Sequence, residues 1–139
     1  MTKKIKEQVK LRAHFRCEYC QVLEDFSSDS FEIEHIFPIC KGGLSSLNNL
    51  ALACRGCNGF KGIRTEWADS NDGKLVPLFN PRTDIWTEHF QWETNQIALI
   101  GLTPTGRVTI DALKMNRRGL LNLRTALILM EEHPPFGTI

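Results

Sequence analysis

The stretch that decides this fold begins with Glu34-His35-Ile36-Phe37-Pro38 and ends with Cys54-Arg55-Gly56-Cys57-Asn58-Gly59-Phe60-Lys61. Apolar and polar residues alternate over 31–36, which predicts a strand. Pro38 predicts its end, because proline donates no ladder hydrogen bond. Phe31 and Ile33 are expected on a core-facing side of this strand. Glu34 and His35 are expected to point to opposite sides of it.

The segment after Pro38 predicts a hairpin and then a helix. Gly42-Gly43 supplies a turn, 48–53 reads as the returning strand, and 55 to about 67 reads as a helix. Two strands followed by a helix make a ββα unit.

Four cysteines predict a structural zinc site. Cys17 and Cys20 are separated by two residues, and Cys54 and Cys57 repeat that spacing farther along the chain. Two such pairs together are typical of a tetrahedral four-cysteine zinc site. The fifth cysteine, Cys40, has no partner at ligand spacing and is expected to be a buried or half-buried thiol.

The remaining segments predict an α+β fold. We expect an N-terminal helix over 2–15 with Thr2 as its cap, and a polar loop over 24–30. A connector is expected over 69–84, with strands over 88–92, 96–101 and 107–110. A long helix over 112–132 would end before Pro134-Pro135. Its apolar stripe is Leu113, Leu120, Leu123, Leu127 and Met130. The predicted organisation is a zinc-stapled core over 1–68 and a C-terminal β/α extension over 69–139 that packs on it.

Composition limits the class of protein. The chain has 139 residues, 42% of them hydrophobic, and a formal net charge of +1. This suits one ordinary domain and excludes a globally basic nucleic-acid binder, although the first sixteen residues are rich in lysine and arginine. No stretch approaches the roughly 18 apolar residues of a membrane span. The absence of a signal-like segment predicts a cytoplasmic protein without a membrane partner. In that compartment cysteines stay reduced, so a Cys-x-x-Cys pair is more often a metal site than a disulfide.

The central stretch resembles the HNH endonuclease motif, also called ββα-metal, in the subgroup with two Cys-x-x-Cys pairs. The matching residues are Cys17-x-x-Cys20, Glu34-His35-Ile36-x-Pro38, Gly42-Gly43, Asn49-Leu50 and Cys54-x-x-Cys57-Asn58-x-x-Lys61. The segment Leu78-Phe79-Asn80-Pro81-Arg82 and the residues after it also look like a C-terminal extension found in some bacterial HNH proteins.

The resemblance implies a role for each residue of the motif. His35 would be the general base, Asn49 would pin the hairpin loop, and Glu34 and Asn58 would hold a divalent ion. The commonest residues at these last two positions are Asp and His. Here a carboxylate and a neutral amide oxygen make a hard, all-oxygen half-site, which favours Mg²⁺ or Mn²⁺ over Zn²⁺. Lys61 and Arg64, along the predicted helix, would contact the nucleic acid. An ordinary imidazole, with a pKa of about 6.5, is mostly neutral at pH 7–8, as a base requires.

Three functions stay open at this stage. The leading one is a metal-dependent DNA endonuclease that cuts one or both strands. The second is a zinc-ribbon-like nucleic-acid-binding module without catalytic activity, and the third is an enzyme acting on RNA. Glu34-His35 together with Asn58 favours the enzyme, because a purely structural ribbon does not need them. Arg117, Arg118 and Arg124 read as a solvated helix face or a second phosphate contact. His14, His89 and His133 read as structural or surface residues, and a monomer and a homodimer are both compatible with the sequence.

Overall fold

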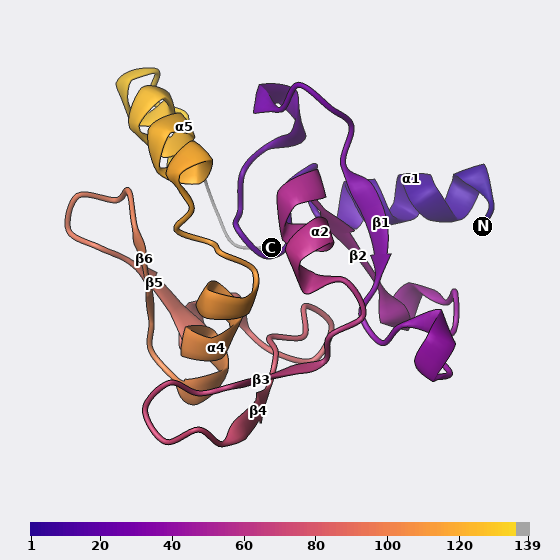
Figure 1. Cartoon of the computed structure of the whole chain (residues 1–139). Helices are drawn as coiled ribbons and strands as arrows, with labels where there is room; N and C mark the ends of the chain where they lie inside the picture. The colour runs from indigo at the N-terminus through magenta and orange to yellow at the C-terminus, as the bar shows by residue number, and fades with distance from the viewer. Residues whose placement is uncertain (136–139) are drawn as a thin grey trace.

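The computed structural model describes residues 1–135 and has the predicted α+β class, with short helices and three two-stranded antiparallel sheets in that range. The α-helices are α1 (Lys3–Arg12), α2 (Arg55–Lys61), α3 (Trp86–His89), α4 (Pro104–Ala112) and α5 (Arg118–Leu129). The strands are β1 (Glu32–His35), β2 (Leu50–Ala53), β3 (Glu66–Ala68), β4 (Leu75–Pro77), β5 (Phe90–Trp92) and β6 (Leu99–Gly101). Three single 3-10 turns cover Glu24–Phe26, Ile39–Lys41 and Leu47–Asn49. In Figure 1, α1, β1, β2 and α2 gather on one side, and β3 to β6 with α4 and α5 on the other.

The β1–β2 hairpin confirms the central prediction. The strands pair antiparallel from Glu32 opposite Ala53 to His35 opposite Leu50. All of β2 is buried, and Phe31 just before β1 is buried as predicted. The opposite face of β1 is also covered, because Glu34 and Glu32 bond to side chains of α2. The hairpin is therefore packed on both sides.

The helix after the second cysteine pair is shorter than predicted. It ends at Lys61 because Gly62 takes a left-handed φ of 53°, and it does not reach Trp67. The chain instead forms a second hairpin, in which Ala68 of β3 pairs with Leu75 of β4. The prediction of a connector over 69–84 was thus wrong at β4. The proposed division after residue 68 falls at the end of β3.

The extension confirms part of two predicted strands and contradicts the third. β5 and β6 pair antiparallel but are shorter than predicted, since Glu88 and His89 lie in α3, and 107–110 lies in α4. Thr103 caps α4 by accepting a hydrogen bond from the Gly106 N–H at 3.0 Å, and Pro104 stands at the first helical position, where its missing N–H costs nothing. A Thr-Pro pair is a helix-start signal, and it outweighs the β-branched residues that follow.

The last helix begins at Arg118 rather than at 112. Residue 112 is instead the end of α4, and a turn with Lys114 at φ 49° separates the two helices. Of its predicted apolar stripe, Leu113, Leu120 and Leu127 are buried, and Leu123 packs partly against the core. Met130 is exposed, so the stripe ends before it. The last four residues of the predicted extension, 136–139, lie outside the described residues.

One hydrophobic core joins both halves of the chain. It includes Tyr19, Leu50 and Leu52 from the first half, and Val108 and Leu113 from the second. The N-terminal helix lies on β2 and is capped by Thr2 as predicted, the Thr2 hydroxyl accepting from the Ile5 N–H at 3.2 Å. Among residues 1–135, no helix has both the length and the apolar character to cross a membrane.

Candidate active site and metal centre

The four predicted cysteines meet at one buried point. Cys17 and Cys20 come from the turn after α1, Cys54 is the N-cap of α2, and Cys57 lies in its first turn. Their sulfur atoms all lie within 4.8 Å of one another, and the Cys20 and Cys54 sulfurs are 3.8 Å apart. Four sulfurs at about 2.3 Å from a tetrahedral zinc are about 3.8 Å from each other. The cluster is therefore compatible with a structural zinc ion. Cys40 lies outside it and is exposed, so the prediction that this thiol is buried or half-buried was wrong.

A guanidinium from the extension lies against this cluster. Arg117 Nη2 is 3.5 Å from the Cys54 sulfur, and Nη1 is 3.6 Å from the Cys57 sulfur. Burial by itself lowers the pKa of Arg117, but the nearby Cys57, Cys54 and Cys20 more than offset this, so the pKa is raised. The interpretation of Arg117 as a solvated or phosphate-binding residue was wrong. No local pattern in the sequence marks this contact, because Arg117 is far from both cysteines along the chain.

Arg124 also lies inside the protein rather than on a solvated face. Its side chain is 1% exposed and donates to the backbone carbonyls of Met115, at 2.7 Å, and Ile97, at 2.9 Å. It also stacks on the Trp92 ring at 5.0 Å. Arg118, by contrast, is exposed as predicted.

Glu34, the predicted metal ligand, lies in a closed environment. Its carboxylate accepts a hydrogen bond from the Tyr19 hydroxyl at 2.6 Å and forms an ion pair with Lys61. The Lys61 ammonium also donates to the Ile36 carbonyl at 2.9 Å, and both charged side chains are almost fully buried. Burial raises the pKa of Glu34, and Lys61 and Tyr19 only partly offset that rise. Burial and the Glu34 charge also raise the pKa of Tyr19.

Asn58, the second predicted metal ligand, is bonded elsewhere. Its side-chain amide donates to the Glu32 carboxylate at 2.5 Å, and Glu32 also lies 3.4 Å from Arg55. Carboxylate and amide oxygens are the donors that hard divalent ions prefer. The arrangement does not fit such an ion, however, because Lys61 already neutralises Glu34 and the Asn58 amide faces Glu32.

His35 and Asn49 both bond to residues of the hairpin loop. His35 ends β1, is half-buried, and its Nε2 lies 2.8 Å from the Ser45 hydroxyl across the hairpin loop. Asn49 ties that loop together, since its Oδ1 accepts from the Phe37 N–H and its Nδ2 donates to the carbonyls of Phe37 and Leu44, each at 2.9 Å. His35 thus lies at the end of a hydrogen-bonded hairpin, and alternation along β1 puts its side chain on the face opposite Glu34.

The two predicted nucleic-acid contacts lie in different surroundings. Lys61 is 1% exposed, so its ammonium is not at the surface. Arg64 is exposed, donates to the Phe60 carbonyl at 3.1 Å and stacks on Trp67 at 5.3 Å. A phosphate contact therefore fits Arg64 better than Lys61. His89 bonds to Thr103 at 2.6 Å and His133 to the Gln96 carbonyl at 2.8 Å, which supports the structural roles predicted for them.

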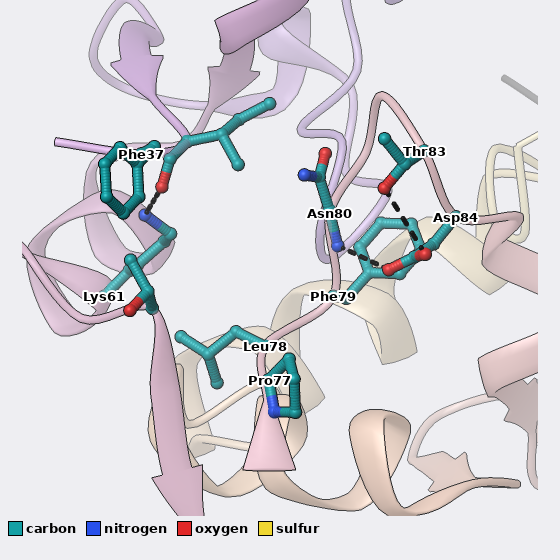
Figure 2. Close-up of a pocket in the computed structure, with 10 residues that line it drawn as sticks. Phe37, Lys61, Pro77, Leu78, Phe79, Asn80, Thr83 and Asp84 are labelled. Carbon is teal, nitrogen blue, oxygen red and sulfur yellow. Dashed lines mark hydrogen bonds between the residues drawn. The ribbon is translucent and has the colours of Figure 1, made fainter. Parts of the chain in front are cut away.

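A pocket of about 280 Å³ lies between the hairpin and the extension, and Ile36, the residue after His35, is part of its lining. Figure 2 shows Phe37 and Lys61 on one side and Asn80, Thr83 and Asp84 on the other. Asp84 accepts a hydrogen bond from the Asn80 N–H at 2.9 Å, which fixes the loop on the extension side. The extension thus forms part of the surface next to the motif.

Comparisons with known proteins agree with this arrangement. A family model described as HNH endonuclease matches residues 17–64, which include the four cysteines, the hairpin and α2. The Septu protein PtuB of Bacillus thuringiensis is 31% identical over 106 residues, and these make up 73% of this chain but only 37% of that relative. No solved structure matches the chain at a significant level. Residues 17–64 therefore match the HNH endonuclease family model, and the chain spans little more than a third of the length of the relative it resembles.

Proposed function

We propose that this chain is a metal-dependent endonuclease that hydrolyses phosphodiester bonds in DNA, with His35 as the general base. The observation that carries the proposal is the position of His35. It is the sole histidine within residues 17–64, it lies at the end of β1, and Asn49 fixes the loop that follows it. An imidazole held in this way can take a proton from water as the water attacks phosphorus.

The other residues of the hairpin have supporting roles in this proposal. Ser45, 2.8 Å from His35 Nε2, orients the ring, and Asn49 keeps the loop that carries Ser45 in place. Attack by water would leave a 5′-phosphate and a 3′-hydroxyl. Exposed Arg64 and the lysines of α1 supply cations near the phosphate backbone. The pocket beside Phe37 supports contact between the extension and the nucleic acid.

Mg²⁺ or Mn²⁺ dependence is part of the proposal and rests on the family, which generally uses a divalent metal. The ligands expected from the motif, Glu34 and Asn58, are bonded to Lys61 and Glu32, so the proposal assigns no ligand to that ion. We derive no step of the reaction through that ion. The structural zinc is proposed at Cys17, Cys20, Cys54 and Cys57, and four thiols kept reduced for zinc support a cytoplasmic location.

The buried ion pair between Glu34 and Lys61 favours a second candidate, because it occupies the carboxylate that would bind a metal ion. This candidate is a zinc-stapled nucleic-acid-binding module without catalytic activity. Plasmid cleavage distinguishes the two. Zinc-loaded protein is incubated with supercoiled plasmid and Mg²⁺, Mn²⁺ or no divalent ion, next to His35→Ala and the control His14→Ala, whose histidine is exposed and outside the family match.

We expect nicked or linear product with the parent protein and with His14→Ala, and none with His35→Ala. Equal cleavage by His35→Ala would refute the role of His35. If the folded protein cuts no plasmid with either ion but shifts DNA in a gel, the binding module is the correct function. If it cuts RNA and not plasmid, the reaction class is right and the substrate is wrong.

A further inference from the structure

The proposed zinc site carries an electrostatic problem that its cysteines do not solve. Four thiolates around Zn²⁺ have a net charge of −2, and all four cysteines are buried. A buried charge is costly unless an opposite charge or hydrogen-bond donors compensate for it. Backbone N–H groups provide part of this, since those of Cys20 and Cys57 lie 3.4 Å from the sulfurs of Cys17 and Cys54.

Arg117 is placed to supply the missing charge. Its two terminal nitrogens reach one sulfur each, so a single guanidinium spans Cys54 and Cys57. Arg124 is a second buried arginine of the extension, but it donates to the carbonyls of Ile97 and Met115. Arg117 is thus the cation that contacts the sulfurs directly.

The cysteine loop is shaped to admit this arginine. A Cβ added at Gly56, between Cys54 and Cys57, would lie within 2.8 Å of the Arg117 guanidinium carbon. Only a residue without a side chain leaves that space for the guanidinium. The role of Gly56 is therefore to let Arg117 approach the sulfurs over the first turn of α2.

Arg117 also fixes the backbone of the extension. Its Nη1 donates to the carbonyls of Leu113 and Lys114, at 3.3 and 3.2 Å, and its own backbone is the N-cap of α5. The same guanidinium therefore bonds both to the metal site and to the turn between α4 and α5.

We propose that Arg117 is an outer-sphere partner of the zinc thiolates, which tightens zinc binding and makes the placement of the α4–α5 turn depend on zinc. The inference rests on zinc in the four-cysteine site and not on nuclease activity. The donors act on sulfur lone pairs, so their loss weakens the zinc–thiolate unit even though all four ligands remain. Loss of an outer-sphere partner typically weakens metal binding by about 10–100-fold.

Zinc affinity in competition with a chromophoric chelator tests the proposal on four variants of the full chain. Arg117→Met removes the charge and the donors. Arg117→Lys keeps the charge but lacks the two guanidinium nitrogens that reach separate sulfurs, and Gly56→Ala pushes the intact guanidinium away. Arg118→Met is the matched control, because it removes an exposed arginine from the adjacent position.

We expect about 10–100-fold weaker zinc binding for Arg117→Met, an intermediate loss for Arg117→Lys and Gly56→Ala, and about unchanged binding for Arg118→Met. With Co²⁺ in place of zinc, every variant should keep the absorption of a tetrahedral thiolate site. In Arg117→Met the sulfur-to-cobalt band should move to lower energy, because sulfurs without N–H donors give up electrons more easily. In the parent protein, zinc removal should expose the α4–α5 turn to proteolysis.

An Arg117→Met protein that is folded, yet binds zinc as tightly as the parent and gives the same cobalt spectrum, would overturn the proposal. In that case Arg117 would only hold the turn. If Arg117→Met does not fold, Gly56→Ala decides the question, since it retains the arginine and changes only its position. Parent-like zinc affinity in Gly56→Ala would then overturn the proposal.

Discussion

Replacement of Lys61 by methionine should destabilise the protein strongly, because it removes one member of a fully buried ion pair. The Lys61 and Glu34 side chains are 1% and 2% exposed. In Lys61→Met, the Glu34 carboxylate keeps only the Tyr19 hydroxyl, and the Ile36 carbonyl loses its donor. Removing one partner of a buried pair costs about 3–5 kcal/mol. For a chain of this size that corresponds to a fall in Tm of roughly 10–20 °C.

The loss should depend on pH in a direction that the structure fixes. Burial already raises the pKa of Glu34, and Lys61 is the largest influence that opposes the rise. Without Lys61 the folded-state pKa of Glu34 rises further above its unfolded value. A raised carboxyl pKa contributes stability below the unfolded pKa, and that contribution is lost as the pH rises through the folded pKa. The Lys61→Met deficit should therefore be largest near pH 8 and shrink towards pH 5.

Urea denaturation of zinc-loaded protein at several pH values measures this effect. Lys41→Met, which removes an exposed lysine, is the control and should be about neutral. The double variant Glu34→Gln/Lys61→Met should be more stable than the sum of the two single losses predicts, because neither charge is left alone. A Lys61→Met loss below about 1 kcal/mol at pH 7, or strict additivity, would refute the interpretation of a coupled buried pair.

Three further predictions follow from single contacts. Asn49→Ala removes three hydrogen bonds of 2.9 Å and should lower the free energy of unfolding by about 1–3 kcal/mol. An unchanged midpoint in urea denaturation would show that the hairpin loop does not depend on these bonds. Burial lowers the pKa of His133, so the unfolded chain takes up the proton first and the protein should lose stability as the pH falls below about 6.5. Scanning calorimetry from pH 7.5 to 5 should show a flatter profile for His133→Gln, and parallel profiles would contradict this. Cys57→Ser should lose tight zinc binding and folding stability while exposed Cys40→Ser keeps both, and equal zinc content in the two variants, measured by atomic absorption, would exclude the four-cysteine site.

The hairpin and the cysteine cluster were predictable because their signals are local. Each Cys-x-x-Cys pair forms its own tight turn, and Pro38, Gly42 and Asn49 mark the ends of the strands. Thr103-Pro104 is an equally local helix start, and the β-branched residues after it led to the wrong prediction of a strand. Gly62 likewise marks the end of α2 with a backbone conformation that glycine favours.

The sequence by itself determined which residues could bind metal, take up a proton and form the ββα unit. Only the tertiary structure decided which groups the lysine and arginine side chains contact. Lys61, Arg117 and Arg124 all read as surface or phosphate-binding charges, yet they meet Glu34, the cysteine sulfurs and buried carbonyls. The physical reason is that the role of a cation depends on the groups it contacts in the folded protein. Lys61 and Glu34 are 27 positions apart along the chain, and Arg117 and Cys54 are 63 apart, so no local spacing encodes these contacts.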